Sequence, residues 1–181
     1  MFGIGPIWLF LFKQRLPFGM MRSGVRPWAS TMATNAAAAV LAGLLMWAVG
    51  VVPFLVVHLP IVVLAGAAGI WLFYVQHQFE DTHWSEPPEW KFPHAALHGA
   101  SNYDLPRPLM WLTGNIGIHH VHHLASRVPY YRLPEVLRDH PELRNIGRIT
   151  IWESIRCVKL VLWDENGRRL VSFREARRLP A

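Results

Sequence analysis

The sequence predicts an all-α membrane protein that combines a transmembrane helical hairpin with a cytoplasmic helical cap. Hydrophobic residues make up 52% of its 181 residues, whereas Asp, Glu, Lys and Arg together make up only 17%. None of these four charged residue types occurs from Pro27 through Phe79, a run of 53 residues. An uncharged run of this length is typical of lipid-embedded segments rather than of a soluble core. Four of the ten histidines lie in residues 119–123, which indicates where a functional site should be sought.

Residues 1–34 are predicted to form a membrane-interface segment and a connector. They begin with apolar and aromatic residues, and the first positive charges, Lys13 and Arg15, come only afterwards. A secretory signal has the opposite order, with its positive charges before its apolar core. The net charge is +6, and the basic residues flank the apolar region and scatter through the tail. They therefore indicate contact with a membrane surface and no nucleic acid.

Residues 35–75 are predicted to form the hairpin. The 40 residues from Ala36 to Val75 are enough for two membrane spans, each of which needs roughly 20 apolar residues. Glycine and proline crowd residues 50–60, where the turn is expected and where His58 would be solvated at the tip. Lys and Arg flank the hairpin but are absent from its tip, and the positive-inside rule then places both of its ends in the cytoplasm.

Residues 76–181 are predicted to form the cytoplasmic cap, with the histidine-rich segment and a C-terminal tail. His77 follows directly on the second apolar run. On a continuing helix, His77, Glu80 and Asp81 would share one face. This arrangement suits a metal ligand whose tautomer is fixed by neighbouring carboxylates. A polar helix end at the membrane surface is an equally weighted alternative.

Three of the clustered histidines form an H-x-x-H-H pattern, in which His119, His122 and His123 share one face of a helix. His120 is rotated off that face and is expected to support the others by hydrogen bonding or packing. A set of imidazoles suits iron, copper or zinc by ligand type. The density of the cluster favours a metal site over a polar turn that happens to be rich in histidine. One loop cannot complete a multi-metal centre, so other ligands must come from elsewhere.

Further features lie outside this cluster. His94 and His98 could also be ligands, although packed or solvated histidines are commoner. In the tail, Thr150 and Glu153 fit a helix-opening capping box, and residues 168–173 are predicted to form a short strand. Cys157 is the only cysteine, so it provides no disulfide framework, and it is expected to be a small apolar filler on a helix.

The segment 114–124, with the sequence GNIGIHHVHHL, resembles the third histidine box of membrane fatty acid desaturases. More narrowly, the chain is similar to the bacterial and cyanobacterial acyl-lipid desaturases of the delta-12 (omega-6) type, over essentially its whole length. The other segments that carry this resemblance are 71–81, 103–106, 127–131, 162–165 and 170–173.

The resemblance implies a four-span histidine-box fold whose cytoplasmic cap holds two irons through three histidine boxes and one extra histidine. It places the third box on His119, His122 and His123 and puts His77 in the region of the extra histidine. No side chain beyond the metal ligands is expected to be catalytic. Glu80, Asp81 and His120 would support the ligands. Such enzymes use dioxygen and two electrons to convert a CH2–CH2 unit of an acyl chain to a cis double bond.

The implied partners are a membrane lipid or an acyl-carrier-linked fatty acyl chain, and an electron donor such as ferredoxin, flavodoxin or cytochrome b5. The implied location is a membrane, crossed several times, with the active site on the cytoplasmic side of a bacterial inner membrane. The family's first and second histidine boxes have no match in the sequence. The resemblance therefore implies the C-terminal half of a desaturase, with an incomplete di-iron centre and no activity alone. The alternatives are a di-iron hydroxylase or ketolase of the same superfamily and a non-catalytic metal-binding membrane protein.

Overall fold

The computed structural model describes residues 8, 15–16 and 24–179, and the chain divides into two compact units at residues 71 and 72. Most of the membrane-interface segment expected at the start of the chain lies outside the described residues. The helix α2 (Val25–Val49) begins well before residue 35, so it includes the end of the segment that the sequence predicts as a connector.

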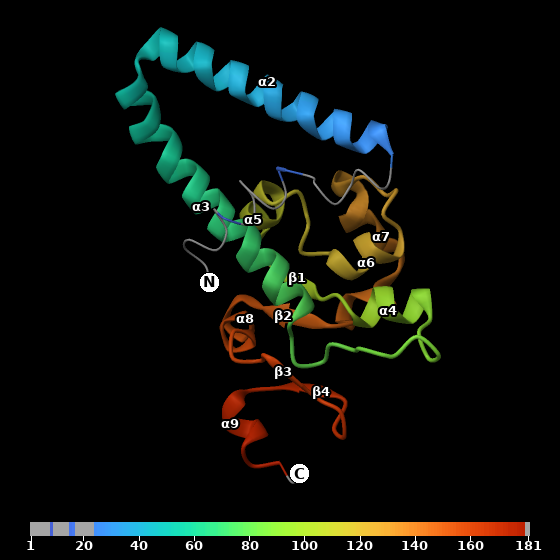
Figure 1. Cartoon of the computed structure of the whole chain (residues 1–181). Helices are drawn as coiled ribbons and strands as arrows, with labels where there is room; N and C mark the ends of the chain where they lie inside the picture. The colour runs from blue at the N-terminus through green and yellow to red at the C-terminus, as the bar shows by residue number, and fades with distance from the viewer. Residues whose placement is uncertain (1–7, 9–14, 17–23, 180–181) are drawn as a thin grey trace. The chain divides into compact units, whose positions relative to one another are not determined.

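The first unit contains α2 and most of α3 (Val51–His77), which form a helical hairpin (Figure 1). The two helices meet at Gly50, whose φ is 90°. Residues that carry a Cβ rarely adopt this backbone conformation. The turn is therefore at Gly50 and does not extend over residues 50–60 as the sequence predicts. Pro60 and His58 both lie inside α3, and the ring of His58 stacks on that of Phe54 with the centroids 4.8 Å apart.

Both helices are long and apolar enough to cross a membrane. At about 1.5 Å per residue, their 25 and 27 residues extend roughly 37 and 40 Å, more than the ~30 Å thickness of a bilayer's hydrocarbon core. Each helix contains an apolar stretch of 18 residues in which no residue is buried. A core helix of a soluble protein would be mostly buried, so these exposed apolar faces have the character of lipid-facing helices.

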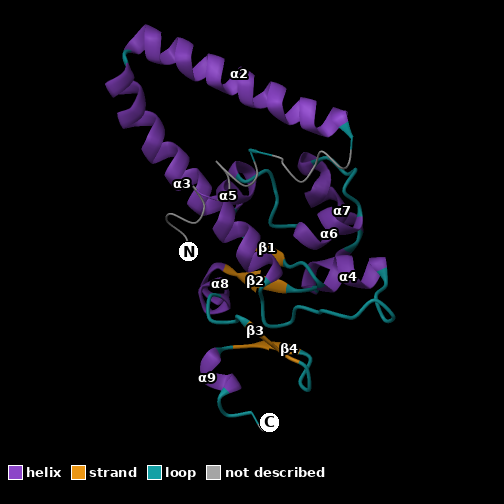
Figure 2. Cartoon of the chain, in the orientation of Figure 1, coloured by secondary structure: helices purple, strands orange, loops and turns teal. Residues whose placement is uncertain are grey.

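The second unit consists of short helices and two small sheets (Figure 2). Strand β1 (Asn102–Asp104) pairs in parallel with β2 (Arg148–Thr150), and β3 (Leu162–Asp164) pairs antiparallel with β4 (Arg169–Val171). β4 confirms the strand predicted at residues 168–173, although it is shorter than predicted at both ends. The helices of this unit are α4 (Phe92–His98), α5 (Arg107–Leu112), α6 (His119–Leu124), η3 (Tyr130–Arg132), α7 (Leu133–Asp139), η4 (Pro141–Asn145), α8 (Ile151–Cys157) and α9 (Phe173–Ala176).

The core of the second unit lies beside α6. Ile118 and Val121 pack with Leu133 of α7, and all three are at most 2% exposed. The predicted capping box at the start of α8 is confirmed, since Thr150 and Glu153 exchange hydrogen bonds in both directions. Cys157 is buried, which raises the pKa of its thiol to about 11 and makes it an inert filler.

Candidate metal centre

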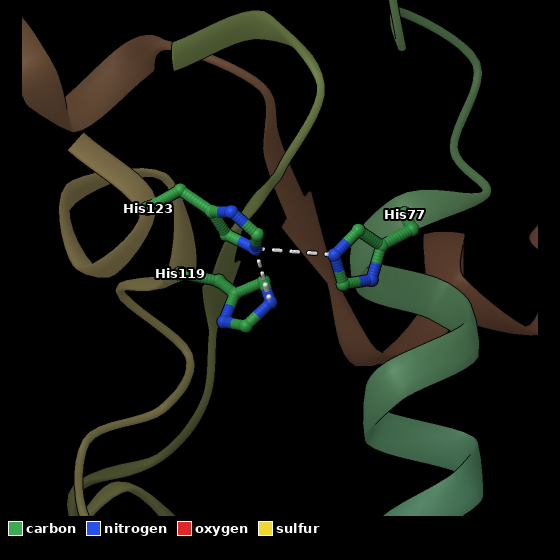
Figure 3. Close-up of side chains that lie close together, drawn as sticks. All are labelled: His77, His119 and His123. Atoms are coloured by element: carbon green, nitrogen blue, oxygen red, sulfur yellow. Dashed lines mark hydrogen bonds between the residues drawn. The ribbon is translucent and has the colours of Figure 1, made fainter. Parts of the chain in front are cut away.

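Three histidines from two distant segments meet in the second unit (Figure 3). His77 is the last residue of α3, whereas His119 and His123 lie one turn apart on α6. The Nε2 atom of His123 lies 3.2 Å from Nε2 of His77 and 3.1 Å from Nε2 of His119. The potential ligand atoms of the three residues all lie within 4.8 Å of one another. Such convergence of imidazole nitrogens is what a shared metal ion requires.

The position of α6 depends on a close backbone approach just before it. The Tyr103 amide of β1 donates a hydrogen bond of 2.7 Å to the Gly117 carbonyl. A Cβ atom at Gly117 would collide with the Tyr103 carbonyl and with the sulfur of Met110. Glycine at this position therefore lets the chain enter α6 against β1, and the helical repeat then turns His119 and His123 to the same side.

The ring of His77 is held by its own helix. Its Nδ1 donates a hydrogen bond of 2.8 Å to the Phe73 carbonyl, because a carbonyl can only accept. This contact leaves the Nε2 atom free of its proton and directed toward His123, as in a metal-ligating imidazole. The sequence-based expectation assigned this orienting role to Glu80 and Asp81. Because α3 ends at His77, those two residues instead lie exposed in the turn that follows and make no hydrogen bond with His77 among the described contacts.

Gln76 connects the end of α3 to the segment that precedes α6. Its side chain is 1% exposed and donates a hydrogen bond of 2.8 Å to the Ile116 carbonyl. Its own carbonyl accepts a hydrogen bond of 2.9 Å from the Ser101 amide. These bonds fix the neighbouring His77 relative to the start of α6. Sequence reasoning did not single out Gln76, and its only signal there was a polar residue beside His77 at the end of an apolar run.

The other two histidines of the cluster occupy different surroundings. His120 is fully buried, and its Nε2 donates a hydrogen bond of 3.0 Å to the Leu143 carbonyl, so it anchors α6 to η4. His122 lies beside the group without joining it. The centroid of its ring is 5.8 Å from that of His119 and 6.1 Å from that of His123. The structure thus brings together three of the four histidines that the sequence predicts as ligands.

Burial favours the uncharged form of His119 and His123. Desolvation, followed by the neighbouring imidazoles of His77, His123, His122 and His120, lowers the pKa of His119 to about 3. Desolvation is also the main cause that lowers the pKa of His123, with His77 and His122 adding to it. A neutral imidazole is the form that binds a metal.

The donor set fits one transition-metal ion. Metal–nitrogen bonds of about 2.1 Å at right angles place two ligand nitrogens roughly 3.0 Å apart. The two Nε2–Nε2 separations of 3.1 and 3.2 Å are close to this distance. Nitrogen ligands suit iron, copper or zinc. The buried Nδ1 atom of His119 has no hydrogen-bond partner among the described residues. The polar contact of its ring is made by Nε2, with His123.

The comparisons with known proteins concern nearly the whole chain. A family model described as fatty acid desaturase matches residues 2–154. A fatty acid desaturase of Bacillus subtilis (strain 168) is 41% identical to the chain over 180 residues. This match covers 99% of the chain and 51% of the relative, so the chain spans about half the length of the curated relative it matches.

Proposed function

The chain belongs to the fatty acid desaturase family, and from this premise we propose that it supplies part of the metal centre of an O2-dependent acyl-chain desaturase. The family predicted from the histidine-rich segment is thereby confirmed. The observation that carries the proposal is the meeting of the His77, His119 and His123 side chains, because their ring nitrogens converge as metal ligands do. In this proposal the reaction introduces a cis double bond into a fatty acyl chain.

His77, His119 and His123 would hold the metal directly, with His122 beside them as a further ligand on the same helix. Bound iron would supply the oxidising power, with dioxygen and two electrons, to remove hydrogen from two adjacent methylene groups, which no side chain can do alone. Three or four imidazoles are too few for two irons. We therefore expect this group by itself to hold one ion.

The residues around the ligands would keep that geometry fixed. The Phe73 carbonyl holds the tautomer of His77, and the Gln76 amide ties the end of α3 to the approach to α6. His120 anchors α6 from its buried side. Rigid support of this kind matters because outer hydrogen-bond partners typically change metal affinity or activity by about 10- to 100-fold.

The chain is a membrane protein, as its family and its two long apolar helices support. In the proposal, α2 and α3 cross the membrane and the cap lies on the cytoplasmic side, in a bacterial inner membrane. The distribution of Lys and Arg supports this orientation. The substrate would be an acyl chain of a membrane lipid or of an acyl carrier, and the electrons would come from ferredoxin, flavodoxin or cytochrome b5.

A chimera tests the proposed reaction. The chain would be joined to the part of the Bacillus relative that it does not match, expressed in a bacterium, and the cellular acyl chains analysed by mass spectrometry. We expect a new cis double bond that disappears with His123→Ala while the protein remains in the membrane. Hydroxylated or keto products that depend on His123 would instead support a hydroxylase or ketolase. An inserted, iron-loaded chimera without any product would contradict the enzymatic proposal.

A further inference from the structure

A second group of histidines lies in the same unit but outside the candidate metal centre. It consists of His83, His94 and His98, here called the outer histidine cluster. The ring centroids of His83 and His94 are 4.5 Å apart with the planes nearly perpendicular, at 82°. Those of His94 and His98 are also 4.5 Å apart, at 35°. His94 is therefore in contact with both other rings.

The backbone holds these three residues together. His94 and His98 lie four residues apart on α4, so both project from the same side of the helix. The His83 amide donates a hydrogen bond of 2.9 Å to the His98 carbonyl, which binds the segment after α3 to the end of α4. One helix and one backbone hydrogen bond therefore hold the backbone of the three residues together, and no bound ligand is needed for this.

Within the described part of the chain, the ring nitrogens of the outer histidine cluster have no hydrogen-bond or ion-pair partner. The three side chains line a cavity of about 430 Å³ together with the carboxylates of Glu80 and Asp81. Desolvation is the main cause that lowers the pKa of His83 and of His98, so both are neutral near pH 7. Neutral imidazoles with open nitrogens beside carboxylates suit a cation.

Two arginines also line this cavity, but each has a carboxylate partner of its own. Arg168 pairs with Glu89 at 2.9 Å, and Arg169 pairs with Glu175 at 3.8 Å. These carboxylates offset part of the arginine charge, but Arg168 still contributes to lowering the pKa of His83. Glu80 and Asp81 line the same cavity and provide the negative charge that a positive ligand requires.

We propose that the outer histidine cluster is a second metal site. It binds one divalent cation of intermediate hardness, such as Zn²⁺, through His94, His98 and His83. Imidazole is a good ligand for such ions, and a pair spaced four residues apart on a helix can chelate one ion. Among the described residues only the His77 group has all its ligand atoms within 4.8 Å. Binding at the outer histidine cluster therefore requires rotation of the imidazoles, and we expect weaker affinity there than at the His77 group.

Zn²⁺ binding to the purified full chain in detergent tests this site. Equilibrium dialysis would compare the wild type with three variants: His94→Gln with His98→Gln, His119→Gln with His123→Gln, and the control His140→Gln. His140 is exposed, pairs with Glu142 and belongs to neither histidine group. We expect two Zn²⁺ per chain in the wild type and in the control. Each double variant should lose one ion, and the outer variant should lose the weaker.

The outcomes separate the two sites. Equal Zn²⁺ binding by the outer double variant and the control would overturn the second site, whatever the other variant does. Unchanged binding in the His119→Gln, His123→Gln variant would instead count against the candidate metal centre and leave the outer site standing. The single variant His94→Gln keeps the test decisive if the double variant fails to fold, because the exposed His94 tolerates substitution. It too should lose the weaker ion, and full retention of that ion would overturn the proposal.

Discussion

His123 is the residue that joins the two halves of the candidate metal centre. Its Nε2 atom is the only one among the described histidines with short contacts to both His77 and His119. His122, its neighbour on α6, lies further from the group. Because His123 makes the short contacts and His122 does not, we expect substitutions of these two adjacent histidines to differ in their effect on metal binding.

We expect His123→Ala to weaken metal binding at the centre by more than about 100-fold, because it removes a direct ligand rather than an outer partner. His122→Ala should weaken it less. Titration with Co²⁺, followed by its visible absorption, would compare the two variants. A larger loss with His122→Ala than with His123→Ala would show that the H-x-x-H-H pattern identifies the ligands better than the observed contacts do.

Gln76 gives a second expectation, which concerns support rather than ligation. Gln76→Leu leaves the Ile116 carbonyl without its donor, and an unsatisfied buried polar group costs about 1–3 kcal/mol. Thermal unfolding in detergent would measure this loss, and Co²⁺ affinity should fall with it. Gln78→Leu is the matched control, since the buried side-chain oxygen of Gln78 has no hydrogen-bond partner in the described residues. Equal destabilisation by both variants would show that the hydrogen bond from Gln76 to the Ile116 carbonyl does not stabilise the protein.

For single residues, the sequence predicts which side chains share one face of a helix, because helical periodicity decides this. It places His119 and His123 on one face and turns His120 away from it, as found. It does not predict the Gln76 contact, because the Ile116 carbonyl is 40 residues away and reaches Gln76 only after folding. The His77 contact with Phe73 is local to α3, but the sequence does not show which partner the His77 ring takes. The sequence predicts that Glu80 and Asp81 orient the His77 ring, because that prediction takes α3 to continue past His77. No residue in the sequence indicates that the helix ends there.

At the scale of elements, the hairpin turns on one glycine. Gly50→Ala forces a Cβ onto a backbone with a φ of 90°, and such strain costs on the order of 1–3 kcal/mol. Gly43→Ala is the control, because Gly43 is helical and a Cβ there would have nothing within 4 Å. We expect the first variant to unfold at a lower SDS fraction than the wild type and the second to be neutral or slightly stabilised. The reverse order would place the turn elsewhere.

The start of α8 provides an element-scale test in the cap. Thr150→Ala removes a capping hydrogen bond and should destabilise the protein by about 1 kcal/mol. Hydrogen bonds from Thr150 are the main cause that lowers the pKa of Glu153 in the folded state. Their contribution is therefore present above the usual pKa of the carboxyl and is lost as the pH falls through the acidic range. Thermal unfolding at neutral and acidic pH should show a smaller pH effect in Thr150→Ala than in Thr150→Ser.

Composition alone predicts the two apolar helices but not where they join. Proline and glycine between residues 50 and 60 suggest a long turn, yet Pro53 lies in the first turn of α3, where its missing N–H has no partner to lose. Pro60 remains inside the helix. Proline is tolerated within apolar membrane helices. The parallel pairing of β1 with β2 could not be predicted either, because it joins three-residue segments that are far apart in the sequence.

At the scale of the whole molecule, the proposed topology is a two-span hairpin with both ends in the cytoplasm. Reporter fusions at Gly50 and after the last residue should therefore report opposite sides of the membrane. The reason is that Lys and Arg flank the apolar helices but are absent from the turn. A reporter fused after Gln78 is the control and should match the C-terminal fusion. Same-side labelling of the Gly50 and C-terminal fusions would contradict the topology.

The central claim is that His77, His119 and His123 form a metal site that belongs to a larger centre. The most direct measurement is the ferrous ion content of the purified chain under anaerobic conditions, with His94→Gln and His98→Gln present so that the outer histidine cluster does not contribute. We predict one ion per chain, lost on addition of His123→Ala. Two ions per chain would show that the group is a complete di-iron site, and no ion at all would show that these converging imidazoles do not bind iron.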